Sequence, residues 1–220
     1  MPNHHARSLR RGDQAGDIAE ALRAEIVSGA LPAGSDLRQE HLAERFGVSR
    51  MPVRDALRRL ADEGFASLQP NKGAVVAPLG PDDLREITEM RVAAETLALR
   101  LALPELSNAQ IDRAAEIHAR LEVAPVAEFG ALNNEFHRLL YAPCARPRLL
   151  SHIEVLGHAA DRYLRITVSS LDYAGKSHRE HRALLQACRR RDEAKAIACL
   201  TKHIEEAGDA LARLMEAADD

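Results

Sequence analysis

The chain has 220 residues, of which 46% are hydrophobic and only 3% aromatic, with no tryptophan, and its formal net charge is −3 at pH 7. This length suits one large domain or two ordinary ones, and the nearly balanced charge excludes a general polyanion binder, so any contact with nucleic acid must come from a local basic patch. Three cysteines without close pairing favour a reducing, cytoplasmic location over a disulfide framework, and no apolar run approaches the ~18 residues of a membrane span.

The first predicted helix follows a polar N-terminal segment. Residues 1–14 have no apolar periodicity, so we expect them to be disordered. A helix is predicted from residue 17 to residue 28, because apolar side chains recur at 18, 22 and 26, Asp17 is a suitable N-cap and Gly29 follows. Residues 31–37 (LPAGSDL) then have the proline and glycine of a turn-rich connector.

Residues 42–63 (LAERFGVSRMPVRDALRRLADE) predict a helix, a glycine turn and a second helix. In the second helix, apolar side chains recur at the spacing of a buried stripe: Val53, Ala56, Leu57 and Leu60. Residues 45–60 carry five arginines and one acid. Two strand-like runs, 65–69 and 74–78, flank a turn with a basic tip and predict a hairpin. These elements together predict a winged helix-turn-helix domain over residues 15–78.

Everything after this domain has helical periodicity. Residues 78–81 (PLGP) interrupt regular structure and predict a linker at 79–81. Residues 82–220 give no strand signal, and six helices are predicted, at 82–103, 108–123, 125–141, 148–168, 177–190 and 192–217. We therefore expect a mostly α protein, in which a winged helix-turn-helix is followed by an all-helical six-helix bundle.

The quoted motifs carry a family resemblance. Residues 17–78 resemble the DNA-binding domain of the GntR regulators through LPAGSDL, LAERFGVSRMPVRDALRRLADEGF and the PNKGAVV hairpin. Residues 81–220 are similar to the FCD effector domain of that family's FadR subgroup through EMRVAAE, NNEFH and REHRALLQACRRRDEAKAIACLTKHI. Six helices, not seven, look like its VanR branch. The resemblance implies a transcriptional regulator, commonly a repressor, and a two-fold homodimer that reads a palindromic double-stranded operator.

The resemblance also assigns residues that contact DNA. The second helix of the motif would enter the major groove, with Arg50 and Arg54 as base readers, because an arginine fork fits two acceptors of guanine. The expected contacts with backbone or minor groove are Ser49, Lys72 and Gly73. The alternative is that these arginines form only a charged helix face.

Three further positions of this helix are less defined. Met51 stands where the family usually has threonine, which can cap the helix and bond the DNA, and we expect Met51 to alter sequence preference without abolishing binding. Arg58 and Arg59 are either phosphate contacts or part of a solvated face.

In the helical domain, the resemblance implies a divalent-metal site formed by Asn133, His137, His181 and His203. The family usually has aspartate at position 133, and an amide oxygen can still bind a metal but lacks the negative charge, which should weaken the site. Three imidazoles suit a transition metal, and we expect Zn or Ni. The alternative is ordinary packed or surface histidines, as we expect for His118, His152, His158 and His178, although His178 is close enough to His181 in sequence to compete as a ligand.

A small carboxylate is the expected effector. Arg91 interrupts an apolar helix face and could anchor an anion through a bidentate pair, with Arg162 and Arg165 lining the same cavity. The alternative for Arg91 is an ion pair with Glu95 and no ligand.

Two other functions remain open at the level of sequence. Three histidines with open metal positions could activate water in a hydrolase- or isomerase-type metal-dependent enzyme, with Glu135 or Glu95 as base. No nucleophile–base pair or phosphate loop accompanies them, and a fused DNA reader disfavours an enzyme. The third possibility is a pure metal sensor without an organic ligand.

Overall fold

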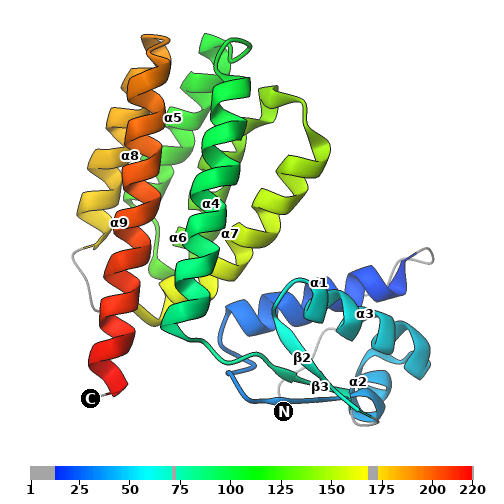
Figure 1. Cartoon of the computed structure of the whole chain (residues 1–220). Helices are drawn as coiled ribbons and strands as arrows, with labels where there is room; N and C mark the ends of the chain where they lie inside the picture. Colours follow the sequence, from blue (N-terminus) through cyan, green and yellow to red (C-terminus); the bar gives the residue numbers. More distant parts are fainter. Residues whose placement is uncertain (1–12, 71–72, 168–172, 220) are drawn as a thin grey trace. The chain divides into compact units, whose positions relative to one another are not determined.

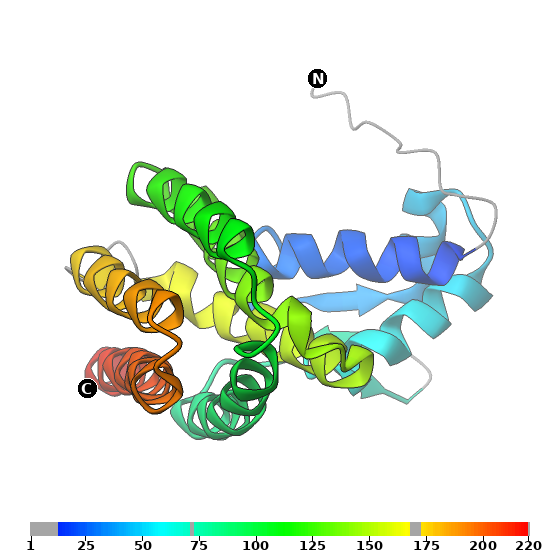
Figure 2. The same ribbon diagram turned by 90° about the horizontal axis from the view of Figure 1, so that it is seen from above.

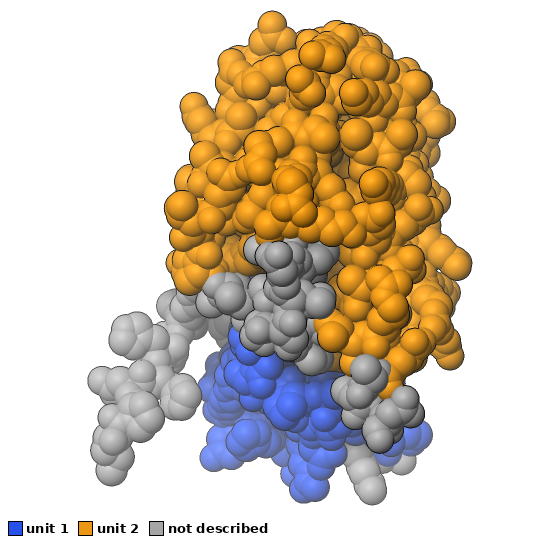
Figure 3. All heavy atoms as spheres, turned by 90° about the vertical axis from the view of Figure 1, so that its left-hand side faces the viewer, with its two compact units in different colours: residues 1–78 blue, residues 79–220 orange. Residues whose placement is uncertain are grey.

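The computed structural model describes residues 13–70, 73–167 and 173–219, and the chain divides into two compact units, residues 1–78 and 79–220 (Figure 3). The predicted disordered segment 1–14 lies outside the described residues except for Asp13 and Gln14. Of the predicted DNA contacts, Lys72 also lies outside them. The predicted fold class, a winged helix-turn-helix followed by a helical domain, is confirmed.

The first unit contains three helices and a small sheet (Figure 1). Helix α1 is Gln14–Val27, α2 is Gln39–Phe46 and α3 is Arg50–Asp62; α2 and α3 are the predicted helix-turn-helix. Gly47 ends α2 with φ +65°, the left-handed conformation that glycine adopts without strain.

The core of this unit lies between α1 and α3. The predicted stripe of α3 is completely buried, and α1 contributes Ile18, Leu22 and Ile26 to the same cluster. Each such side chain contributes roughly 1.5–3 kcal/mol relative to an exposed one. Arg23 of α1 adds a bidentate pair with Glu63 at the end of α3, with N–O distances of 2.6–2.8 Å.

The start of α1 differs from the prediction. The helix begins at Gln14, and Asp13 is its N-cap, with Oδ1 accepting a hydrogen bond from the Gly16 amide at 2.9 Å. Asp17, predicted as the cap, lies inside the first turn. Both aspartates have capping chemistry, and the apolar period that begins at Ile18 does not distinguish them.

The sheet has one strand more than the predicted hairpin. β2 is Ala66–Gln69 and β3 is Gly73–Val76, and β1, Asp36–Arg38, pairs with the other side of β3 in the order β1-β3-β2, all antiparallel. The connector predicted at 31–37 therefore ends in a strand. Gly73 has φ +122°, and a Cβ there would lie 2.3 Å from the Leu37 carbonyl oxygen, so this sheet requires glycine at position 73.

The second unit is an all-helical domain. Within the described residues it contains six α-helices and a 3₁₀ turn, which are α4 (Pro81–Ala102), α5 (Asn108–Glu122), α6 (Val126–Tyr141), η1 (Ala142–Cys144), α7 (Pro147–Thr167), α8 (Tyr173–Arg189) and α9 (Glu193–Asp219). The number of α-helices matches the prediction. Helix α8 begins earlier than the predicted residue 177, because its first turn accommodates Gly175.

Local signals explain several helix ends. Ser107 and Gln110 form a capping box at the start of α5, and Asp192 Oδ1 accepts the Lys195 amide at 3.0 Å before α9. Pro81 occupies the first turn of α4, where its missing N–H has no intrahelical partner to lose.

The helices of the second unit pack as a bundle. Helix α4 contacts α7 and α9, α5 contacts α6 and α8, and α8 contacts α9. Figures 1 and 2 both show α4 and α9 side by side. Their close approach depends on Gly208, where a Cβ would lie 2.4 Å from Thr88 Oγ1. Among the described residues, no helix is both long and apolar enough to cross a membrane.

Candidate metal centre and DNA-binding face

Helix α3 presents a basic surface beside its buried stripe. Arg50, Arg54 and Arg58 are exposed and recur every four residues, so they follow one face of the helix. Arg50 lies 2.8 Å from Glu40, with both side chains more than 60% exposed, and Arg54 lies 3.8 Å from Asp55. Such exposed pairs contribute ~0–1 kcal/mol, so they leave the arginines free to exchange these partners for DNA.

The other arginines of this region have structural partners. Arg59 binds Asp13, the cap of α1, at 3.0 Å, and Arg45 pairs with Glu25 of α1. The pair of Arg59 with Asp13 is itself exposed, so the choice between a phosphate contact and a solvated face stays open for Arg59. Arg58 makes no hydrogen bond or ion pair with another described residue.

The N-terminus of α3 has no side-chain cap. Ser49 occupies the N-cap position but its hydroxyl makes no capping hydrogen bond, and Met51 is already the second helical residue with 65% of its surface exposed. Position 51 therefore lies inside the first turn, after the N-cap position. The uncapped amides and the exposed Met51 are consequently available to a ligand at this end.

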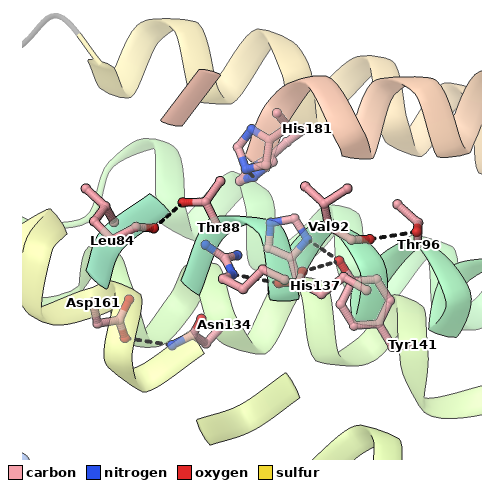
Figure 4. Close-up of polar contacts among 12 residues, drawn as sticks. Leu84, Thr88, Val92, Thr96, Asn134, His137, Tyr141, Asp161 and His181 are labelled. Carbon is pink, nitrogen blue, oxygen red and sulfur yellow. Dashed lines mark hydrogen bonds and ion pairs between the residues drawn. The ribbon is translucent and has the colours of Figure 1, made fainter. Parts of the chain in front are cut away.

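In the helical unit, three buried histidines converge from three helices. One ring nitrogen each of His137 (α6), His181 (α8) and His203 (α9) lie within 4.8 Å of one another. Nε2 of His181 is 3.3 Å from Nε2 of His203. Figure 4 shows His137 and His181 approaching the same point from different helices. The structure thus brings together the three histidines predicted as ligands.

Asn133 belongs to the same neighbourhood. It lies one turn before His137 on α6, is 6% exposed, and its Oδ1 is buried without a hydrogen-bond partner. The Nε2 atom of His137 is buried and unpartnered as well. Buried polar atoms without partners are rare in native proteins, and an absent ligand is one physical reason for them.

A chain of polar contacts orients His137. The Tyr141 hydroxyl lies 2.7 Å from Glu95 Oε2 and 3.1 Å from His137 Nδ1 (Figure 4). The hydroxyl has one proton, and Glu95, which also binds Arg91 at 2.7 Å, accepts it. His137 must then carry its proton on Nδ1 and donate to the Tyr141 oxygen. This tautomer leaves the lone pair of Nε2 directed to the centre of the cluster.

His203 is oriented by a carboxylate. Its Nδ1 lies 2.7 Å from Glu180 Oε2, so Nδ1–H donates to Glu180 and the Nε2 lone pair faces the cluster. Burial lowers the pKa of His137 and of His181 well below the ordinary value, and each is lowered further by the neighbouring His203. Both rings are therefore neutral at pH 7, the state in which imidazole binds a metal.

The donor set fits a divalent transition metal. Three buried imidazoles and one amide oxygen resemble the nitrogen-rich sites of Zn, Ni or Cu more than the all-oxygen sites of Mg or Ca. The second partners of these imidazoles, Tyr141 and Glu180, were not found from the sequence. Glu180 directly precedes His181 in sequence, yet its carboxylate contacts the ring on the next helix.

A small cavity adjoins the cluster. Its polar lining comes from Arg91, Asn133, Thr88 and His203, and the rest is mostly apolar: Leu84, Ala160, Ile204, Ala207, Gly208 and Leu211. Burial lowers the pKa of Arg91, but the charge and hydrogen bond of Glu95, with the charges of Tyr141 and Asp161, together raise that pKa above its ordinary value, so the guanidinium stays charged. Arg91 is paired with Glu95, as the alternative interpretation expected, and it also lines the cavity, so its role as an effector anchor stays a prediction.

The two other predicted effector residues are placed differently. Arg162 is a buried residue of α7 that is absent from the described lining of this cavity, and burial lowers its pKa. The side chain of Arg165 lies outside the described part of the structure.

The sequence also missed a second group of histidines. His118, expected to be an ordinary packed residue, and His178 each place a ring nitrogen within 4.8 Å of one another and of a nitrogen of His181. The only signal was the short spacing from His178 to His181, because His118 comes from another helix.

Comparison with known proteins settles the family. Residues 14–76 match the family described as "Bacterial regulatory proteins, gntR family", and residues 86–206 match the FCD domain. The chain belongs to the GntR family. Like its relatives in that family, it is a DNA-binding transcriptional regulator and not an enzyme.

Individual relatives agree with this assignment. The chain is 32% identical over 196 residues to "Uncharacterized HTH-type transcriptional regulator BphR" of Paraburkholderia xenovorans, covering 84% of this chain and 80% of that protein. It is 30% identical over 204 residues to "Probable D-xylose utilization operon transcriptional repressor" of Paenarthrobacter nicotinovorans, covering 90% and 89%.

Solved structures of the GntR family share the fold. A GntR-family regulator from Pseudomonas syringae pv. tomato is 35% identical, with a TM-score of 0.60, covering 94% of this chain and 87% of the other. Escherichia coli McbR/YncC, at 24% identity, shares the fold with a TM-score of 0.80 over 92% and 98%.

Proposed function

We propose that this protein is a homodimeric repressor, working in the cytoplasm, whose FCD domain senses a small carboxylate at a divalent metal ion. The observation that carries the proposal is the convergence of three buried histidines and the unpartnered amide oxygen of Asn133 beside a cavity lined by a buried arginine. The six α-helices of the described effector domain support its placement in the VanR-like branch.

For DNA binding, we assign base recognition to Arg50 and Arg54. They are exposed at the N-terminal half of α3, on a face beside its buried stripe. Ser49, Lys72 and Gly73 contact backbone or minor groove, and exposed Met51 contributes an apolar contact such as one with a thymine methyl group. One helix reads too few base pairs for specificity, so a two-fold dimer and a palindromic operator follow.

For metal binding, we assign Asn133, His137, His181 and His203 as ligands of Zn or Ni. The bound ion would supply an electrophilic centre with open positions for a carboxylate oxygen. Since the donor set is neutral, the dication keeps its full charge, and an anionic ligand is attracted more strongly than at a site with an aspartate.

For the effector, Arg91 is the anchoring residue that the geometry supports best. It lines the same cavity as Asn133 and His203, and a guanidinium can bind a carboxylate in bidentate fashion. Its present partner Glu95 is a carboxylate too, so an anionic ligand and Glu95 would share the guanidinium donors. Arg162 and Arg165 of α7 complete the proposed set. The effector shifts DNA affinity only if it binds with different affinity to the dimer arrangement that fits the operator and to the arrangement that does not.

Selection from a random pool of duplexes tests the DNA-binding part of the proposal. The expected result is an enriched palindromic sequence, bound by a dimer as measured by mass photometry or sedimentation. No enriched sequence with either the zinc-loaded or the metal-free protein would overturn it. The same selected duplex then serves for titrations with zinc, chelator and small acids. A response to metal alone, with every acid inactive, would replace effector sensing by metal sensing.

A further inference from the structure

His181 is shared by two groups of histidines. Its Nε2 faces His203 in the centre described above. On the other side of the ring lies a second group, formed with His118 of α5 and His178 of α8, in which one nitrogen per residue lies within 4.8 Å of the others. The three rings are close to edge-on, with centroids 5.5 Å apart for His118 and His178 and 5.4 Å apart for His118 and His181.

The nitrogens of this second group are unsatisfied. Nε2 of His118, Nδ1 of His178 and Nδ1 of His181 are each buried without a hydrogen-bond partner. The opposite nitrogens are directed elsewhere, because Nδ1 of His118 lies 3.8 Å from Glu122 and Nε2 of His181 faces His203. A ligand shared by the three rings is one physical reason for buried nitrogens without partners.

The chemistry of the group suits a cation with nitrogen ligands. Burial lowers the pKa of all three histidines, so the rings are neutral and have lone pairs to donate. Glu122 lies 3.8 Å from Nδ1 of His118, too far for a hydrogen bond, and supplies a negative charge beside the group. His178 is only partly buried and gives the group a side open to entry.

We propose that His118, His178 and His181 form a second transition-metal site, and that His181 bridges it to the first. Nε2 of His181 binds the first ion and Nδ1 binds the second. A neutral imidazole has one ring proton, so occupying both nitrogens releases that proton to solvent and leaves a bridging imidazolate. Tetrahedral ligands about 2.0–2.1 Å from zinc are about 3.3 Å apart, so the rings must move slightly inward on binding.

Sharing a ligand couples the two ions. The bridge rests on the first metal site proposed above, whereas binding of an ion by His118 and His178 does not require it. Any effect of the second ion on the affinity of the first is matched by an equal reciprocal effect. Metal loading at the second site would therefore tune the centre that binds the effector.

Equilibrium dialysis of the full chain against buffered free zinc, followed by elemental analysis, tests the site. The wild type is expected to hold two ions per chain, and His118→Gln and His178→Gln one each. His152→Gln, at an exposed position of α7, is the matched control and should keep two. One ion in the wild type, or two in both variants, would overturn the proposal. Far-UV circular dichroism checks that the helices are retained, and the partly exposed His178 is the variant least disturbing to the core.

Two further measurements separate the parts of the proposal. His203→Gln should lose only the ion of the first site. If this variant still holds two ions, the assignment of the first site is wrong, and the metal content of His118→Gln still tests the second site. Loading with Cu²⁺ tests the bridge, since two ions joined by an imidazolate couple magnetically and lose the single-ion signal in electron paramagnetic resonance. His178→Gln should restore that signal. Two uncoupled copper signals in the wild type would exclude a bridge through His181.

Discussion

The phenol oxygen of Tyr141 lies 3.1 Å from Nδ1 of His137, one turn earlier on the same helix. Because Tyr141 gives its proton to Glu95 at 2.7 Å, His137 is held in the tautomer that binds a metal through Nε2. Glu95 in turn holds Arg91, so the residue assigned to the effector and a residue assigned to the metal belong to one chain of contacts. This chain is a physical route by which a carboxylate at Arg91 can affect the metal centre.

Replacing the tyrosine hydroxyl should weaken metal binding. In Tyr141→Phe, His137 loses the acceptor for Nδ1–H, and loss of such an orienting partner typically lowers metal affinity ~10–100-fold. Competition with a chromophoric zinc chelator measures the change. Tyr163→Phe is a matched control, because Tyr163 is equally buried but its hydroxyl contacts Asp83. Equal zinc affinity in Tyr141→Phe and wild type would show that the tyrosine does not orient the ligand.

Asn133→Asp should tighten the metal site. The carboxylate adds a negative charge to a buried set of neutral ligands, and it replaces an amide oxygen that has no other partner. Asn133→Ala should weaken the site, and the same chelator competition orders the three proteins. Asn134, whose Nδ2 is 2.6 Å from Asp161, gives the control Asn134→Ala. A weaker site in Asn133→Asp would mean that position 133 is not a ligand.

Substitutions of the arginines of α3 should have different effects on DNA binding and on stability. Arg54→Ala should reduce the discrimination between bases at one base pair by ~1–3 kcal/mol. Lys72→Ala should weaken binding to all duplexes alike and reduce the slope of log affinity against log salt concentration by about 1. Arg59→Ala, which removes the contact with Asp13, should lower thermal stability and keep the preference of the wild type. Binding titrations on the selected duplex and on single-base variants, at several salt concentrations, make the comparison. Uniform loss on every duplex for Arg54→Ala would reassign that residue to the phosphates.

Acid should destabilise the metal-free protein. The pKa values of His137 and His181 are well below the ordinary 6.5 in the folded chain, mainly through burial, so in the window below 6.5 only the unfolded chain takes up these protons. The contribution of these two histidines to the free energy of unfolding is complete above pH 6.5. It is lost as the pH falls, at up to roughly 1.4 kcal/mol per pH unit for each histidine. Urea unfolding with chelator at pH 7.5 and 5.5 measures it. His137→Gln should show a shallower dependence, and an unchanged one would mean that His137 titrates normally.

Most of the fold could be predicted from periodicity and end signals. The stripe Val53, Ala56, Leu57 and Leu60 defined α3 because one buried face repeats every 3.6 residues. Strand β1 was missed because three residues cannot display an alternating pattern, and its pairing with β3 is decided by contacts distant in sequence. The start of α1 was misplaced because Asp13 and Asp17 carry the same capping chemistry.

The candidate site could be predicted only in part. His137, His181 and His203 were found through a family resemblance, and their convergence required three helices to pack at one level. Tyr141 and Glu180 gave no signal, since which partner a polar residue meets depends on tertiary packing. His118 was overlooked for the same reason, because a single histidine on an apolar helix face resembles an ordinary core residue.

The most direct test of the account is the affinity of the protein for its selected duplex, measured by fluorescence anisotropy with and without a small acid. The acid is the one among acetate, lactate, succinate and citrate that most raises the melting temperature of the zinc-loaded protein. We expect this acid to change DNA affinity by about 5–150-fold, the usual range of coupling between sites, and we expect the change to disappear with chelator or in His137→Ala. Equal DNA affinity under every combination of zinc and acid would contradict it.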